Sequence, residues 1–127
     1  MYFGIVGAII HTHSMNAVLA TLIADGNEFR VCNQEMIKGI KKGSGSESYR
    51  NDETLIVPII ENMPYERDLV ATMEQAIEQY PNTNAVLVRK HGLYVWGSTW
   101  QSAKIQAECY DYLFNYVVES KRLGISL

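Results

Sequence analysis

Histidine and cysteine are scarce in this chain of 127 residues, which contains three of the former and two of the latter. Cys32 and Cys109 lie far apart and form no CxxC pair, so buried structural thiols in a reducing compartment fit best, although one disulfide stays open. Basic residues are not in excess either, because the formal net charge is −3. This charge argues against a general nucleic-acid binder, which would carry a basic surface.

Long apolar runs are also missing from the sequence. No stretch approaches the ~18 apolar residues of a membrane span. The apolar start of the chain, residues 1–10, has neither the basic segment nor the small-residue cleavage site of a signal peptide. We therefore expect a cytoplasmic protein that contacts neither a membrane nor nucleic acid.

The length of the chain predicts one domain, residues 1–127, and 47% of the residues are hydrophobic, which is enough to form a core. Strand-like and helical segments alternate, which predicts an α/β protein with helices on both faces of one sheet. Pro58 favours a sheet edge or a bulge, Ser14 is a candidate helix N-cap, and Gly124 is a candidate C-cap. The expected strands are 5–10, 28–32, 55–60, 85–88 and 93–96, and the expected helices are 17–23, 34–40, 64–80 and 97–123.

The three histidines stand at the ends of apolar, strand-like segments. His11 and His13 follow the run from Ile5 to Ile10, and residues two apart on a strand point to the same side. His91 follows the run from Ala85 to Lys90. Three neutral imidazoles brought together would hold a divalent ion and leave a coordination position open, as in a catalytic zinc site. The other interpretation is that the histidines are unrelated residues of the core or rim.

Three segments of the chain resemble the class II aldolase/adducin family. They are Gly7 to Ser14, which contains the His-x-His pair, Asn33 to Ile40, and Arg89 to Gly97, which contains a His-Gly pair. Within the family, the Gln-Glu-Met-Ile-Lys-Gly-Ile run is most similar to the dehydratase branch that acts in methionine salvage. The resemblance implies a three-layer αβα fold of class II aldolase type with a central, largely antiparallel sheet.

The resemblance also implies a reaction and the residues that carry it. His11, His13 and His91 would bind one zinc ion per subunit, and Glu35 would be the catalytic acid and base. The reaction would remove water from 5-methylthioribulose 1-phosphate and leave a 2,3-diketo-5-methylthiopentyl phosphate. The resemblance further implies that the chain forms a homo-oligomer, which would be a tetramer. It also implies an apoptosome-related protein as a partner. From spacing alone, Glu35 would only complement the dipole of a helix whose first turn it occupies.

The chain departs from the family pattern at its start, where family members extend well upstream of the His-x-His strand. The resemblance therefore implies a domain that lacks its N-terminal part, including most of the loops that hold the substrate phosphate. The apolar strand from Ile5 to Ile10 would then lose pairing partners. An unpaired apolar strand is a template for aggregation. Two further functions stay open: an impaired subunit that acts through protein partners or mixed oligomers, and a sugar-phosphate aldolase or epimerase of the same family.

Basic side chains surround the Gly/Ser-rich loop at residues 41–48. Lys38, Lys41, Lys42 and Arg50 could meet a phosphate there. A solvated basic face on a loop is the preferred interpretation, because charge clusters of this kind are usually exposed to water. The residues that bind the substrate are therefore not identified from the sequence.

Overall fold

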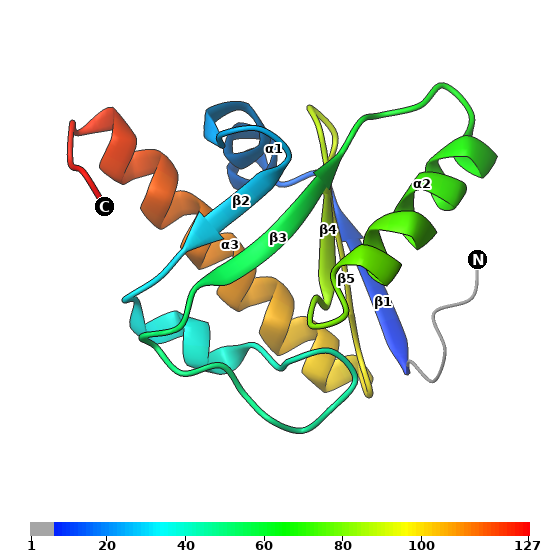
Figure 1. Ribbon diagram of the computed structural model, residues 1–127, viewed down its shortest axis with the longest axis horizontal. Helices are drawn as coiled ribbons and strands as arrows, with labels where there is room; N and C mark the ends of the chain where they lie inside the picture. Colours follow the sequence, from blue (N-terminus) through cyan, green and yellow to red (C-terminus); the bar gives the residue numbers. More distant parts are fainter. Residues whose placement is uncertain (1–6) are drawn as a thin grey trace.

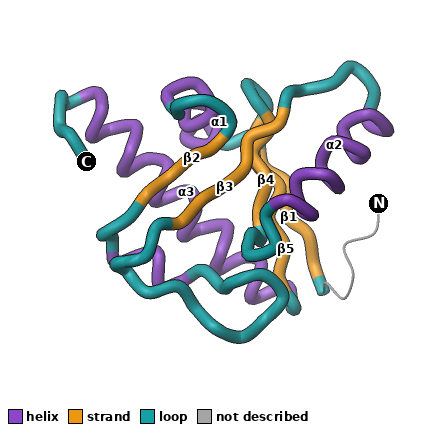
Figure 2. The backbone as a smooth tube through the Cα atoms, in the orientation of Figure 1, coloured by secondary structure: helices purple, strands orange, loops and turns teal. Residues whose placement is uncertain are grey.

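The computed structural model describes residues 7–127, so residues 5 and 6 of the expected first strand lie outside the described part. The chain forms three layers, with a five-stranded sheet between helices (Figures 1 and 2). The strands are β1 (Ala8–Thr12), β2 (Glu28–Val31), β3 (Leu55–Ile60), β4 (Ala85–Val88) and β5 (Gly92–Gly97). Their order is β1-β5-β4-β3-β2, and only the β3–β4 pair is parallel. The predicted α/β class and the largely antiparallel sheet are confirmed.

The pairing fixes which loops meet at each end of the sheet. Because β1 and β4 are each antiparallel to β5, and β3 is parallel to β4, the strands β1, β3 and β4 run in one direction. β2 and β5 run in the other direction. The segments that follow β1, β3 and β4 therefore meet at one end of the sheet, which we call the histidine end because it carries residues 11–13, 61–62 and 89–91. The segment that follows β2 leaves at the opposite end.

Helices cover both faces of the sheet, as the alternating pattern predicted. The helices α1 (Met15–Ile23) and α3 (Trp100–Arg122) lie on one face, and α2 (Glu66–Gln79) lies on the other (Figure 1). The short 3-10 helix η1 (Glu35–Gly39) packs against α3. Two buried clusters fill the spaces between the layers, one centred on Phe29, Tyr110 and Phe114 and the other on Leu69, Met73 and Val86. None of the helices in the part of the chain that is described combines the length and the apolarity needed to cross a bilayer.

Both ends of α3 are formed by local hydrogen bonds. At the start, the Thr99 hydroxyl accepts from the backbone N–H of Ser102 at 3.0 Å. At the end, Gly124 has a φ of +77°, its N–H donates to the Lys121 carbonyl, and the next N–H donates to the Ser120 carbonyl. This pair of bonds is a Schellman motif, so the predicted C-cap at Gly124 is confirmed.

Ser14 takes its predicted N-cap position without a side-chain capping bond, and the prediction that Pro58 lies at a sheet edge is wrong. Ser14 stands at the N-cap position of α1, but its hydroxyl donates to the Asp111 carboxylate and not to the helix backbone. Pro58 lies on an interior strand, because β3 has β2 on one side and β4 on the other. Pairing with β2 ends at Pro58 and pairing with β4 begins at Ile59, so the missing N–H of proline interrupts no bond to β4.

Several apolar residues are exposed, and the prediction that both cysteines are buried is wrong for Cys32. Ile9 on β1 is 44% exposed, so this strand is not buried on both faces, and among the described strands it pairs with β5 alone. Trp100 and Ile105 on α3 are 60% and 54% exposed, because both lie away from the face that packs on the sheet. Cys32 is also exposed, whereas Cys109 is buried, and both thiols are free.

Candidate metal centre

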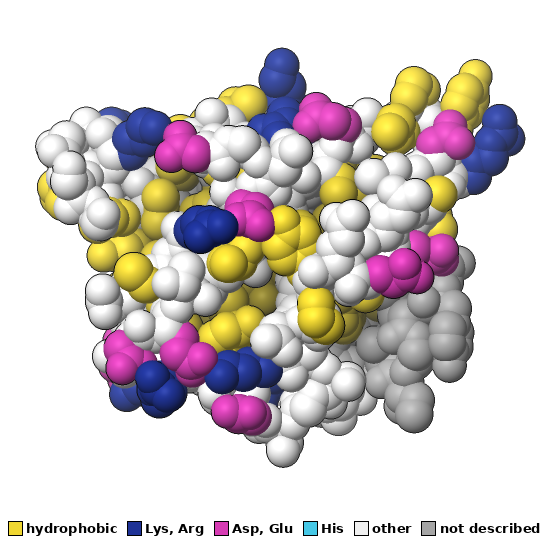
Figure 3. Space-filling model, in the orientation of Figure 1, with side chains coloured by type: hydrophobic (Ala, Val, Ile, Leu, Met, Phe, Trp, Pro, Cys, Tyr) yellow, Lys and Arg dark blue, Asp and Glu magenta, His cyan; other side chains and the backbone are white. Residues whose placement is uncertain are grey.

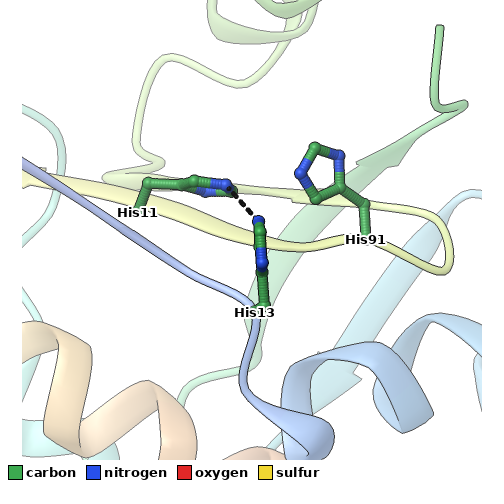
Figure 4. A group of neighbouring side chains, drawn as sticks. All are labelled: His11, His13 and His91. Carbon is green, nitrogen blue, oxygen red and sulfur yellow. Dashed lines mark hydrogen bonds between the residues drawn. The ribbon is translucent and has the colours of Figure 1, made fainter. Parts of the chain in front are cut away.

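The histidine end of the sheet brings all three histidines together. His11 lies on β1, His13 follows it by two residues, and His91 lies in the turn between β4 and β5. The ring centroids are 4.7 Å apart for His11 and His13, 5.0 Å for His11 and His91, and 4.9 Å for His13 and His91. One nitrogen from each ring lies within 4.8 Å of the other two, and Figure 4 shows the rings pointing toward a common region.

The donor set fits a divalent ion. Tetrahedral nitrogen ligands at 2.0–2.1 Å from an ion lie about 3.3 Å from one another, and the two Nε2 atoms of His11 and His13 are 3.0 Å apart. The Nδ1 of His11 donates to the Leu93 carbonyl at 3.0 Å, and the Nδ1 of His91 donates to Oδ1 of Asn62 at 3.1 Å. With Nδ1 engaged in these bonds, Nε2 is the nitrogen of each ring that can bind an ion, and the bonds hold the rings in orientation.

The surroundings also favour a neutral imidazole at His91. Partial burial lowers the pKa of His91, and the neighbouring His11 and His13 lower it further. The ring of Tyr94, which pairs with His11 across the β1–β5 ladder, stacks on the His11 ring at 4.0 Å between centroids and 18° between planes. A neutral, oriented imidazole is the form that binds a metal ion.

We expect the affinity for a divalent ion to fall by about tenfold or more between pH 7.5 and pH 5.5, because protons compete for the three imidazoles.

The lowered pKa of His91 also has a consequence for the stability of the metal-free protein. The unfolded chain binds a proton near the ordinary histidine pKa of about 6.5, while the folded chain resists it, so stability is lost as the pH falls below that value. Isothermal titration and thermal unfolding at the two pH values measure these effects. An affinity that is equal at both pH values would contradict a site made of histidines.

The structure does not bring Glu35 to the histidines within one chain. Glu35 begins η1, which follows β2 at the end of the sheet opposite the histidine end. β2 and β1 are the two edges of the sheet, and four strand spacings of about 4.8 Å separate them by roughly 19 Å. The Glu35 side chain is 70% exposed and forms an ion pair with Lys38 at 2.9 Å.

The basic residues near the Gly/Ser-rich loop all have protein partners. Lys38 pairs with Glu35, Lys42 pairs with Glu53 at 2.7 Å, Arg50 pairs with Asp52 at 2.9 Å, and Lys41 donates to the Ser48 hydroxyl. On the face shown in Figure 3, basic side chains lie beside acidic ones. This arrangement agrees with the solvated basic face that we preferred from the sequence.

Asn62 and Gly92 support the histidine end, and the sequence analysis missed both. Asn62 follows β3, which is parallel to β4, so its position beside the turn that carries His91 could have been read from the pairing of these strands. Gly92 has a φ of +156°, and a Cβ atom there would lie 2.0 Å from the Thr12 carbonyl oxygen on β1. The His-Gly pair thus combines a ligand with the close approach of two strands.

The chain is similar to known proteins of one family. The sequence model of the family named Class II Aldolase and Adducin N-terminal domain matches residues 3–118. A methylthioribulose-1-phosphate dehydratase from Aquarana catesbeiana is 60% identical over 119 residues, which are 94% of this chain and 50% of that protein. The enzyme of the same name from Salmo salar is 61% identical over 118 residues, which are 93% of this chain and 47% of that protein.

The fold has a solved counterpart. The crystal structure of YgbL from Klebsiella pneumoniae superposes with a TM-score of 0.63 at 20% identity, over 91% of this chain and 50% of that one. The chain spans about half the length of the curated relatives it matches. The likeness to YgbL supports the class II aldolase-like three-layer fold and nothing finer.

Proposed function

The chain belongs to the class II aldolase and adducin family, and we propose that it takes part in the dehydration of methylthioribulose 1-phosphate at a zinc site. The observation that carries the proposal is the convergence of His11, His13 and His91, whose nitrogens lie within 4.8 Å of one another. The high identity to dehydratases supports this reaction over aldol cleavage or epimerisation. Because the chain covers half of those relatives, its activity and its substrate remain part of the proposal.

The reaction requires that a C–H bond beside the ketone and a C–O bond on the next carbon break, so that water leaves and an enol remains. The enol becomes the diketone when it loses its hydroxyl proton and gains one on carbon. A divalent ion held by the three imidazoles would polarise the ketone oxygen and stabilise the negative charge that develops there. The imidazoles of His11 and His91 keep their Nε2 atoms directed to that position through the Leu93 carbonyl and Asn62. A carboxylate must take the proton from carbon and return one to the departing hydroxyl, and we assign this role to Glu35.

This assignment requires a second copy of the chain. Within one copy, Glu35 lies at the opposite end of the sheet from the histidines. Its carboxylate is exposed, and among residues 7–127 it pairs with the exposed Lys38 alone, so it is accessible to another subunit. We therefore propose a homo-oligomer in which Glu35 of one subunit faces the histidines of its neighbour.

We expect Glu35→Gln to reduce turnover by about 10²–10⁴-fold, because glutamine keeps the shape of the side chain but cannot accept the proton. The zinc content should stay at the level of the parent chain, since Glu35 is not among the ligands. Turnover and zinc content are measured on the same preparation. Loss of zinc together with turnover would make Glu35 a ligand and favour an aldolase-like site.

The proposed function is tested by assaying the purified chain for zinc and for dehydration of methylthioribulose 1-phosphate, with His91→Ala as the metal-free control. The proposal expects turnover in the parent chain and none in the variant. Stoichiometric zinc without turnover would favour the second candidate, a subunit that needs complementary chains. That candidate has its own support, because β1 pairs with β5 alone among the described strands.

A further inference from the structure

Arg89 makes more hydrogen bonds than any other basic side chain for which bonds are described, and it begins the turn that carries His91. Its Nε donates to the Glu61 carboxylate at 2.7 Å, its Nη1 donates to the Thr21 carbonyl at 2.8 Å, and its Nη2 donates to Oδ1 of Asn27 at 2.9 Å. These acceptors lie on α1, on the turn that follows it and just after β3. The guanidinium therefore ties three separate segments to the start of the turn.

Two backbone N–H groups of the same turn also donate hydrogen bonds to other segments. The Arg89 N–H donates to the Ile60 carbonyl at 2.9 Å, and the Lys90 N–H donates to the Thr21 hydroxyl at 3.1 Å. Lys90 has a φ of +59°, a conformation that costs free energy for a residue with a side chain. Thr21 is fully buried, so the acceptor that holds this conformation is itself fixed.

His91 depends on this turn more than the other two histidines depend on their surroundings. His11 and His13 come from one continuous segment at the end of β1, so their separation is set by local geometry. His91 reaches them from a different pair of strands. A small displacement of residues 89–91 would change the distance from His91 to both partners and leave the pair itself intact.

We propose that Arg89 is a positioning residue of the histidine centre, which fixes the turn at residues 89–91 so that the His91 imidazole meets His11 and His13. The inference rests on the metal site of the proposed function and goes beyond it, because Arg89 does not touch the ion. A guanidinium suits this task because its planar fork serves several acceptors at once, which an ammonium group cannot do. Groups that orient metal ligands typically contribute 10–100-fold to metal affinity.

The test is the zinc dissociation constant of the full chain, measured by competition with a chelator at a temperature well below unfolding. We expect Arg89→Gln to raise this constant at least tenfold, with Arg89→Lys in between. The matched control is Arg122→Gln, which removes an exposed arginine paired with Glu119 and should leave the constant unchanged. Unchanged zinc affinity in folded Arg89→Gln would overturn the proposal.

Thermal unfolding of the metal-free variants separates positioning from general stabilisation. A lower melting temperature with the parent's zinc affinity means that Arg89 only stabilises the fold, which also overturns the proposal. If Arg89→Gln does not fold, Thr21→Val takes its place, because it removes the acceptor of the Lys90 N–H with little change in shape. That variant should weaken zinc binding severalfold, and parent-like affinity would contradict the inference. Zinc binding by a chain that fails to dehydrate methylthioribulose 1-phosphate would reject the proposed function and leave this inference standing.

Discussion

A mixture of two inactive variants is expected to regain dehydratase activity. Glu35→Gln keeps the histidines and loses the carboxylate, whereas His91→Ala loses the metal ligand and keeps the carboxylate. If Glu35 serves the neighbouring subunit, random mixing places an intact centre beside an intact Glu35 at about a quarter of the sites, so about a quarter of the parent turnover should return. The gain over Glu35→Gln alone is then about 25- to 2,500-fold, given its expected loss of about 10²–10⁴-fold.

The expectation follows from the topology of the sheet. Glu35 and the histidines lie at opposite ends of the sheet, and β2, which precedes Glu35, and β1, which carries His11, are its two edges. No rearrangement of side chains within one copy spans the roughly 19 Å of strand spacings between them. The variants are mixed after unfolding and refolding together, and each variant treated alone is the control. A mixture that stays inactive while the refolded parent is active would place Glu35 outside the catalytic site.

Replacing Gly92 by alanine should have the largest effect on stability. The new Cβ atom would lie 2.0 Å from the Thr12 carbonyl oxygen and 3.1 Å from the Cα of His13, at a φ of +156°. Backbone strain of about 1–3 kcal/mol and a steric clash of similar size together predict a loss of about 4 kcal/mol in the free energy of unfolding. Because the clash falls on β1 at the histidines, zinc binding should be lost as well.

Gly26→Ala is the matched control for this prediction. Gly26 also has a positive φ, +66°, but no atom lies within 4 Å of a Cβ atom built there. The control should therefore cost about 1 kcal/mol from the backbone conformation alone and leave zinc affinity unchanged. Urea unfolding and zinc titration measure both variants. Equal destabilisation by the two substitutions would mean that the contact between β5 and β1 does not constrain residue 92.

The convergence of the three histidines is one feature that the sequence predicted well. The spacing of His11 and His13 on a strand determines that they share a side, because side chains alternate along a strand with a period of two. The end of an apolar run at His91 predicted a third histidine at a strand end, and it lies in the β4–β5 turn. Local periodicity could not show that these strands are neighbours, and the register of Thr12 opposite Leu93 supplies that information.

Predictions that depended on surroundings were less successful. Cys32 was expected to be a buried thiol, but its exposure depends on which faces other elements cover. Ser14 has the residue type of an N-cap, but its hydroxyl donates a hydrogen bond to the carboxylate of Asp111, which is distant in sequence. Both outcomes arise from contacts between segments far apart in the chain, which a local pattern does not contain.

The sequence by itself determined the alternation of strands and helices, the end of α3 at Gly124 and the identity of three candidate ligands. Each of these is a local property, set by side-chain periodicity or by the backbone freedom of one residue. The tertiary structure alone decided that His91 meets the pair, that Arg89 and Asn62 hold it there, and that Glu35 lies at the other end of the sheet. These follow from strand order and direction, because the order of strands in a sheet decides which loops meet, whatever their order along the chain.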